Sequence, residues 1–322
     1  MSIQTDTASV TPRVSVILPV YNDAQFVAPA VRSILDQSFS DFELIAIDDG
    51  SSDNCYRILQ EFELADPRVK VFWHPNRGLG PTLNRGISIA KGELIARQDA
   101  DDQSHAERLA KQVKFLDAHP EVVLLGCFAR VMDVEGRILY ENRLAVIDEE
   151  LRGELKTTSP FIHGAVMMRA SQVKAVGGYR DIVWLEDLLL WRAFAHRGEL
   201  ANLAEALYDY RVSPTNLYVP RKLQRQVAAV FSRLWPDDDL SPADFEMLEM
   251  IRSKITPRVR RGQYHLNLAK GLMLNNGNRQ QARHHIKEAL QISPFSPDLW
   301  FHLILSLLPS GASKRWRAIR RG

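Results

Sequence analysis

Three aspartates within four positions are the first feature of this 322-residue sequence that could do chemistry. Asp99, Asp101 and Asp102 follow the apolar run 93–96, and a helix start of Ser, His, Ala and Glu comes next. On an extended segment, Asp99 and Asp101 would project to one side because they are two positions apart. Paired carboxylates after a buried strand suit a hard divalent cation, which usually takes further ligands from substrate phosphates. An acidic turn that caps a helix would have the same composition.

Four apolar runs that read as buried strands accompany this triplet. They are residues 13–20, 42–47, 69–73 and 93–98. Nearly continuous apolar strands are typical of parallel sheets that are covered on both faces. Helical patterns, with apolar residues three and four positions apart, separate the runs. The alternation predicts an α/β unit with a largely parallel sheet.

Polar clusters directly follow three of these strands. They are Tyr21-Asn22-Asp23, Asp48-Asp49 and residues 99–102. Because ligands bind at the carboxyl ends of strands in such sheets, the coincidence favours a nucleotide with a metal over a simple capping turn. The sequence has no Walker A phosphate loop and no Gly-x-Gly-x-x-Gly after the first strand. A P-loop kinase and a Rossmann dehydrogenase therefore both fit poorly.

Composition and charge narrow the classes further. Cys55 and Cys127 lack CxxC spacing, which indicates a reducing compartment without a disulfide or zinc framework. Residues 1–10 are polar without a signal-peptide pattern, and no run of ~18 apolar residues predicts a membrane span. The net charge of +2 and the lack of nucleic-acid-binding motifs predict that no nucleic acid is bound. A cytoplasmic protein is expected.

The ordered set of motifs resembles family 2 glycosyltransferases, and the resemblance spans roughly residues 12–215. The matching stretches are VSVILPVYN at 14–22, IDDGSSD at 47–53, Asn76-Arg77-Gly78, ARQDADD at 96–102, Glu107-Arg108-Leu109, His163-Gly164, Gly177-Gly178-Tyr179-Arg180, Glu186-Asp187 and Tyr210-Arg211. The resemblance implies the α/β GT-A fold of nucleotide-diphospho-sugar transferases, with a mostly parallel central sheet. A C-terminal α-helical extension is expected beyond it.

The resemblance also implies a donor site for a nucleotide-diphosphate sugar. A UDP-sugar is expected, because a carboxylate at Asp48 would accept a hydrogen bond from a uracil-like base. The residues implied to bind the nucleotide are Pro19, Val20, Tyr21, Asp23, Asp48, Asp49, Arg77 and Asp99. A divalent metal, Mn²⁺ or Mg²⁺, is implied on Asp101 and Asp99.

For catalysis, the resemblance implies an inverting transfer with Asp187 as the base and Glu186 beside it. The base would take the proton of the acceptor hydroxyl. The metal would stabilise the leaving diphosphate, so no general acid is required, and the transition state would resemble an oxocarbenium ion. His163, Arg211 and Trp184 are implied on the acceptor or diphosphate side. Outside the family context, Glu186-Asp187 would suit a helix N-terminus and His163 a core position.

The sequence departs from the family pattern in places. Leu188-Leu189-Leu190 stands where another acid and a tyrosine are common, and Val212-Ser213 stands where a histidine is frequent. The lack of Gln-x-x-Arg-Trp and of membrane helices favours a single addition over processive synthesis. A sugar-phosphate nucleotidyltransferase would need a Gly-rich loop with Arg and Lys after the first strand. The sequence has Pro19-Val20-Tyr21-Asn22 there, so this alternative fits poorly. A non-enzymatic alternative is a degenerate nucleotide-sugar-binding or scaffold protein that uses its helical C-terminus for interactions.

We expect a flexible N-terminus at 1–11, a GT-A glycosyltransferase domain at 12–219 and a helical region with a basic tail at 220–322. Part of that region resembles a tetratricopeptide-like hairpin that is too short for a stable array. An apolar helix at 299–308 precedes a basic, Trp-bearing tail. It suits either peripheral contact with the cytoplasmic face of an anionic membrane or a core helix with a solvated tail. The expected acceptor is a glycan or a lipid-linked acceptor in cell-surface polysaccharide assembly.

Overall fold

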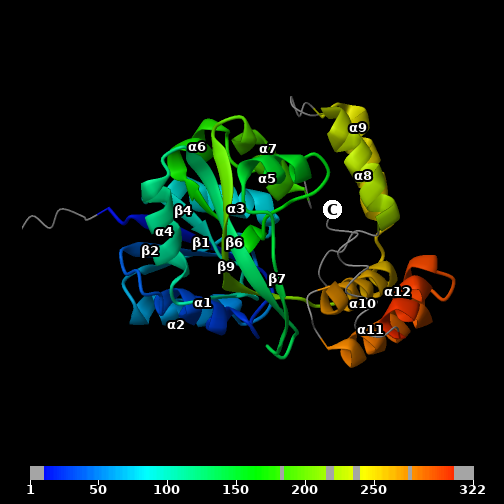
Figure 1. The fold of residues 1–322 in the computed structure, drawn as a ribbon. Coiled ribbons are helices and arrows are strands. Elements are labelled where there is room, and N and C mark those ends of the chain that lie inside the picture. Colours follow the sequence, from blue (N-terminus) through cyan, green and yellow to red (C-terminus); the bar gives the residue numbers. More distant parts are fainter. Residues whose placement is uncertain (1–10, 182–184, 215–220, 235–239, 275–277, 308–322) are drawn as a thin grey trace, which may run out of the picture. The chain divides into compact units, whose positions relative to one another are not determined.

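The computed structural model describes residues 11–181, 185–214, 221–234, 240–274 and 278–307 (Figure 1). The chain packs as two compact units. The first holds the residues up to 128 together with 144–155 and 159–209, and the second holds 129–143, 156–158 and the residues from 210 onward. Trp184 and the basic tail lie outside the described residues.

The strands are β1 (Val14–Val20), β2 (Phe42–Asp48), β3 (Val69–Trp73), β4 (Leu94–Arg97), β5 (Gln103–Ser104), β6 (Val122–Met132), β7 (Ile138–Asn142), β8 (Met167–Arg169) and β9 (Glu199–Arg211). The helices are α1 (Val27–Leu35), α2 (Cys55–Ala65), α3 (Leu79–Ile89), α4 (Arg108–Ala118), α5 (Asp148–Leu155), the 3₁₀ turn η1 (His163–Ala165), α6 (Ala170–Ala175), α7 (Glu186–Ala195), α8 (Arg221–Leu234), α9 (Pro242–Ser253), α10 (Pro257–Leu274), α11 (Arg279–Ile292) and α12 (Pro297–Leu307).

The described strands form one nine-stranded sheet in the order β3-β2-β1-β4-β8-β6-β9-β5, with β7 paired to β6. The four strands β3, β2, β1 and β4 run parallel. β8 runs antiparallel to β4 and β6, and β5 runs antiparallel to β9. The predicted α/β class is confirmed, and the parallel half is the part of the sheet that carries the predicted polar clusters.

The register brings the ends of three strands to one edge. Val20 at the end of β1 lies opposite Asp48 at the end of β2, and Arg97 at the end of β4 lies opposite Ile17. The backbone N–H of Asp49 donates to the Val20 carbonyl at 2.8 Å. Because parallel strands end at the same edge, the loops after β1, β2 and β4 meet there, which we call the rim.

Helices cover both faces of the parallel half. Val16 and Leu18 of β1 pack in one core with apolar side chains of α1, α2 and α4. Ile17 points to the opposite face, which α3 covers. A Cβ added to Gly86 of α3 would lie 2.5 Å from Cγ2 of Ile17, so the glycine permits this close approach. Burial on both faces explains why these strands read as continuous apolar runs.

The second unit joins a β-hairpin to the C-terminal helices. The end of β6 pairs with β7, and Tyr264 and Leu268 of α10 share a core with Val131 of β6. A Cβ added to Gly271 would lie 2.1 Å from Cζ of Tyr140, so α10 packs closely on β7 at this point. The apolar stripe of α10 explains why residues 129–143 belong to the second unit.

Helices α11 and α12 lie beside α10 in the same unit (Figure 1). Leu266 of α10, Ala289 of α11 and Leu299 of α12 form a small core between the three helices. The side chain of Asn278 begins α11, because its Oδ1 accepts from the backbone N–H groups of Gln280 and Gln281. The expected C-terminal helices are therefore present.

Candidate active site

The carboxylate of Asp48 is fully buried at the end of β2. Its Oδ1 accepts from the backbone N–H of Ser51 at 2.7 Å. Its Oδ2 is buried and has no hydrogen-bond partner among the described residues. A buried oxygen without a donor is costly, so a ligand N–H that reached Asp48 would satisfy a real deficit.

The turn after β1 is tied to the turn after β2. Asn22 has a φ of 56°, in the left-handed region that asparagine tolerates better than most residues. Its Oδ1 accepts from the Ser52 N–H at 2.8 Å, and its own N–H donates to Ser51 Oγ at 3.0 Å. Tyr21 is 50% exposed, so its ring is free to meet a base.

Pro19 and Val20 are both buried within β1. Their side chains therefore belong to the core, and any contact with a nucleotide would have to come from the backbone at the strand end. Those two nucleotide contacts stay predictions.

The carboxylate of Asp49 shapes the loop before α3. Its two oxygens accept from the backbone N–H groups of Arg77 and Gly78, at 2.7 and 2.9 Å. His74 Nδ1 lies 3.3 Å from the same carboxylate. Asp49 therefore positions the loop that carries the exposed Arg77 side chain.

The acidic triplet lies in a turn. β4 ends at Arg97, and the Asp102 N–H donates to the Asp99 carbonyl at 3.3 Å, which closes a turn over 99–102. The expectation of an extended segment with Asp99 and Asp101 on one side is therefore wrong. Gln98 stabilises the turn, because its side-chain amide donates to the carbonyls of Asp99 and Asp102.

Asp99 is held by a buried arginine and faces other carboxylates. Arg97 is fully buried, and its Nη2 donates to Asp99 Oδ1 at 2.6 Å. Asp23, from the turn after β1, has its pKa raised to about 6 by burial and by the negative charges of Asp53 and Asp99. The structure therefore brings Asp23 and Asp99 into one electrostatic site, as the sequence predicted for the rim.

Three distant residues pack closely around Asp99. Its backbone N–H donates to Tyr208 Oη at 3.1 Å. A Cβ added to Gly164 would lie 2.1 Å from Tyr208 Oη and 2.6 Å from Asp99 Oδ2. Arg108 is also buried, lies over the Tyr208 ring, and donates to the carbonyls of Gly164 and Arg97. Sequence reasoning missed this packing, although a glycine interrupting an apolar run indicates a close approach.

Asp187 lies in the first turn of α7 and is half-buried. Burial raises its pKa, while hydrogen bonds from the Leu188 N–H and from the Ser159 side chain lower it in part. The positive charge of Arg97 also acts on Asp187. Since Arg97 contacts Asp99 directly, one buried cation acts both on Asp99, which is predicted to bind the nucleotide, and on Asp187, the predicted base. A raised pKa brings a carboxylate closer to the range useful for a general base.

His163 is a neutral side chain that is linked to Asp187 through Tyr179. Burial, with the positive charge of Arg97, lowers its pKa well below the usual value. Its Nε2 lies 2.9 Å from Tyr179 Oη, and its ring packs edge-on against Trp191. Burial also raises the pKa of the Tyr179 hydroxyl, which interacts electrostatically with Asp187. The predicted acceptor-side His163 therefore lies in the same electrostatic site as Asp187.

The remaining predicted residues are placed differently. Arg211 is buried, and its Nη1 donates to the carbonyls of Asp133 and Val134 at 2.9 and 3.1 Å, within the second unit. Its predicted contact with a diphosphate stays a prediction. Glu186 is buried beside Asp187 in the first turn of α7.

The rim suits a hard divalent cation in its donor chemistry. The side chain of Asp99 is 28% exposed, and its contact with Arg97 is made by Oδ1 and not by Oδ2. Asp101 is half-buried. Within the described ranges, no three His, Cys, Asp or Glu side chains gather into a metal-binding group. Mg²⁺ is commonly held by only one or two carboxylates, with substrate phosphates and water completing the shell. The rim therefore fits a cation that arrives with a nucleotide diphosphate.

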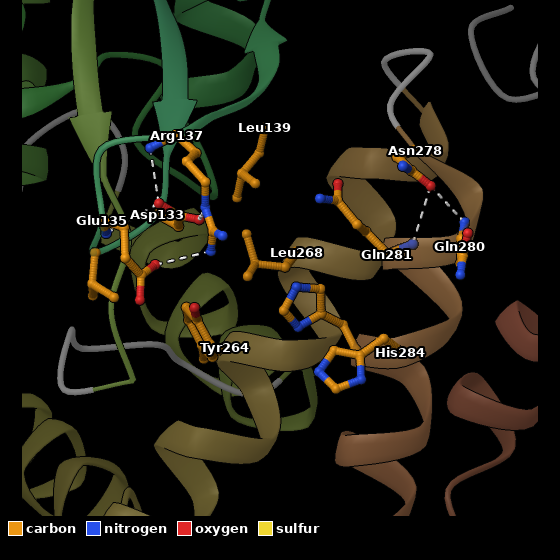
Figure 2. Close-up of a pocket in the computed structure, with 12 residues that line it drawn as sticks. Asp133, Glu135, Arg137, Leu139, Tyr264, Leu268, Asn278, Gln280, Gln281 and His284 are labelled. Carbon is orange, nitrogen blue, oxygen red and sulfur yellow. Dashed lines mark hydrogen bonds and ion pairs between the residues drawn. The ribbon is translucent and has the colours of Figure 1, made fainter.

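A separate cavity of about 530 Å³ lies within the second unit (Figure 2). Tyr264 and Leu268 line it, and Arg137 stands between Asp133 and Glu135, with donor–acceptor distances of 2.7 and 3.0 Å. These three charged side chains pair with one another at the cavity, where two carboxylates face one guanidinium. None of the predicted site residues lines it.

Comparisons with known proteins identify the family. The model of the family described as Glycosyl transferase family 2 matches residues 15–176. A putative glycosyltransferase of Bacillus subtilis, EpsE, is 38% identical over 206 residues, which cover 62% of this chain and 73% of EpsE. The amylovoran biosynthesis glycosyltransferase AmsE of Erwinia amylovora is 29% identical over 201 residues, which cover 61% of this chain and 75% of AmsE. The chain belongs to glycosyltransferase family 2, and it is a glycosyltransferase.

Solved structures share the fold. S. aureus TarS 1–349, solved in complex with UDP-GlcNAc, matches with a TM-score of 0.54 at 19% identity, over 87% of this chain and 81% of that one. The mannosyltransferase PcManGT of Pyrobaculum calidifontis, solved with GDP-Man and Mn²⁺, matches with a TM-score of 0.54 at 18% identity, over 97% and 85%. The predicted GT-A fold is confirmed. Each helix in the described ranges is too short or too polar for a transmembrane segment.

Proposed function

We propose that this glycosyltransferase moves a sugar from a UDP-sugar to an acceptor hydroxyl, once per binding event and with inversion, in cell-surface polysaccharide assembly. The polysaccharide setting is supported by the name of the relative AmsE. The proposal is supported mainly by Arg97, a buried cation that donates to Asp99 and acts electrostatically on Asp187, and by Asp48, which ends β2 at the same edge of the sheet. We assign residues 12–219 to catalysis and 220–322 to an accessory role.

The donor base is recognised by Asp48. A uracil ring presents one imide N–H, and the buried Oδ2 of Asp48 is an acceptor that lacks a donor. Tyr21 is exposed beside the same strand ends and stacks on the base. Asp99 faces the ribose, and its orientation is maintained by Arg97 and Tyr208. Guanine also has N–H donors, so a purine nucleotide is the control ligand.

Asp101 and Asp99 would hold the divalent cation. When bound, a Mn²⁺ or Mg²⁺ ion supplies Lewis-acid stabilisation to the negative charge of the departing diphosphate. The carboxylates at the rim repel one another, as the raised pKa of Asp23 indicates, so a cation bound there also relieves that repulsion.

Asp187 is the base for the acceptor. As the acceptor oxygen attacks the anomeric carbon, one carboxylate oxygen of Asp187 takes the hydroxyl proton, while the bond from that carbon to the diphosphate oxygen breaks on the opposite face. The configuration is therefore inverted. General-base assistance of this kind contributes roughly 10²–10⁴-fold to the rate. Ser159 and the Leu188 N–H orient the carboxylate, and neutral His163, the partner of Tyr179, adds no charge to the site.

A turnover assay tests the proposal. Release of UDP from a panel of UDP-sugars, with Mn²⁺ and simple glycoside or lipid-linked acceptors, is compared between the wild type, Asp187→Asn and Asp181→Asn. Asp181 is an exposed carboxylate six positions away and serves as the matched control. We expect loss of acceptor-dependent release in Asp187→Asn alone. Nucleotide binding without any turnover in the wild type would instead favour the degenerate scaffold.

A further inference from the structure

The outward face of α12 carries large apolar side chains that the transfer reaction does not use. Trp300, Phe301, Ile304 and Leu307 are 49, 41, 58 and 63% exposed. Their spacing places them on one side of a helix with 3.6 residues per turn. Phe295, in the turn before α12, is 94% exposed. We call these five residues the apolar face.

The opposite side of α12 is firmly packed. Leu299, His302 and Ser306 are buried. Arg283 of α11 donates from Nη2 to the Ser306 carbonyl at 2.7 Å. One side of the helix is therefore held in place while the apolar face stays exposed. A contiguous group of exposed large apolar side chains marks an interaction surface, so the apolar face is suited to a partner surface.

The charge of this part of the chain selects the partner. Residues 257–322 contain twelve Lys and Arg and two acidic residues, a net charge of +10. Because the whole chain carries +2, residues 1–256 carry −8. Five of the basic residues follow α12 directly in the sequence, at Lys314, Arg315, Arg317, Arg320 and Arg321. Residues 257–307 alone contain seven Lys and Arg and two acidic residues, a net charge of +5. An apolar face on a basic part of the chain is complementary to an anionic lipid surface.

We propose that α12 lies in the interface of an anionic membrane, with the apolar face inserted among the lipid chains. Aromatic side chains such as Trp300 and Phe301 are typical of this interface. A second copy of the chain would bring two strongly basic regions together, and a soluble polyanion would leave the apolar face in water. The observations therefore favour the bilayer over both.

This inference rests on the proposed function in one respect, which is that membrane binding would bring the active site to a lipid-linked acceptor. Vesicle binding requires no turnover, so the two proposals can fail separately.

The experiment measures co-sedimentation of the full chain with phosphatidylcholine vesicles containing about one third phosphatidylglycerol, and with phosphatidylcholine alone. The variant Ile304→Asp/Leu307→Asp removes two inserted side chains and is expected to lower the partition coefficient at least about tenfold. Leu64→Asp is the matched control, because Leu64 is 89% exposed on α2. We expect the control to bind as the wild type does, and the wild type to bind neutral vesicles weakly.

A second readout locates the inserted side chain. Both native cysteines are buried, so a thiol-reactive environment-sensitive dye placed at Ile304→Cys labels that position selectively. Its emission should shift to the blue with anionic vesicles, and the same dye at Leu64→Cys should not shift.

Equal vesicle binding by the wild type and Ile304→Asp/Leu307→Asp would overturn the proposal, as would an unshifted dye at position 304. A concentration-dependent dimer that the same variant abolishes, without vesicle binding, would assign the apolar face to a second copy and would also overturn it.

Discussion

Gly164→Ala tests the packing that holds Asp99 at the rim. Gly164 lies in η1, and a Cβ there would sit 2.1 Å from Tyr208 Oη and 2.6 Å from Asp99 Oδ2. Tyr208 Oη has no room to retreat because Tyr208 is fully buried, and the hydrogen bond from Arg97 to Oδ1 restrains the Asp99 carboxylate. Overpacking of this kind costs about 1–3 kcal/mol. We therefore expect a Tm lower by roughly 2–12 °C, at about 2–4 °C per kcal/mol.

The same displacement should weaken donor binding. Asp99 faces the nucleotide in our account, so we expect the dissociation constant for UDP in the presence of Mn²⁺ to rise roughly tenfold, about 1.4 kcal/mol. Differential scanning fluorimetry measures the Tm, and isothermal titration calorimetry measures the affinity. Tyr208→Phe in the Gly164→Ala background removes the nearest atom and should recover part of the Tm.

Gly153→Ala is the matched control. Gly153 lies in α5, and a Cβ there meets no atom within 4 Å. A glycine-to-alanine change at such a position is expected to stabilise by about 0.4–1 kcal/mol. If Gly164→Ala kept the Tm and the UDP affinity of Gly153→Ala, the packing around Asp99 would be refuted.

Three further predictions follow from the site. Asp187→Asn should lower the transfer rate roughly 10²–10⁴-fold while UDP binding stays within experimental error. Because burial raises the pKa of Asp187, the wild-type rate should fall on the acid side at a pH above the ordinary aspartate pKa of 3.8. An unchanged rate in Asp187→Asn would show that Asp187 is not the base. The pKa of Asp23 is about 6 in the folded state against 3.8, so the folded state loses stability as the pH rises through this window; Asp23→Asn should raise the Tm at pH 8 in thermal melts, and a difference that persisted below pH 3 would contradict this. Asp49→Ala leaves the Arg77 and Gly78 N–H groups without acceptors, which should cost about 1–3 kcal/mol by urea unfolding; an unchanged midpoint would show that the loop does not depend on this carboxylate.

The parallel half of the sheet could be predicted from the sequence. The apolar runs at β1, β2 and β4 show no alternation, which occurs when both faces are covered. Since parallel strands share one carboxyl edge, the convergence of Asp23, Asp48 and Asp99 followed from their positions after those strands. The apolar pattern of these strands and their parallel order therefore predict the same edge for the three carboxylates.

Other parts of the site depend on contacts between distant residues. Tyr208 meets Asp99 across 109 positions, and Gly164 is required only because those two side chains converge on it. Residues 99–102 form a turn and not an extended segment, because the side-chain amide of Gln98 donates hydrogen bonds to the carbonyls of Asp99 and Asp102. Likewise, residues 129–143 belong with the C-terminal helices because α10 buries Tyr264 and Leu268 against Val131. No local pattern encodes such pairings.

The most direct test of the account is a thermal-shift titration of the full chain with UDP and with GDP, each with and without Mn²⁺, on the wild type and on Asp101→Asn. A ligand at 100 times its dissociation constant adds about 2.7 kcal/mol to the stability of the folded state. We predict a rise in Tm with UDP that requires Mn²⁺, exceeds the rise with GDP and is lost in Asp101→Asn. A well-folded wild type that responds to neither nucleotide, or responds identically in Asp101→Asn, would contradict the account.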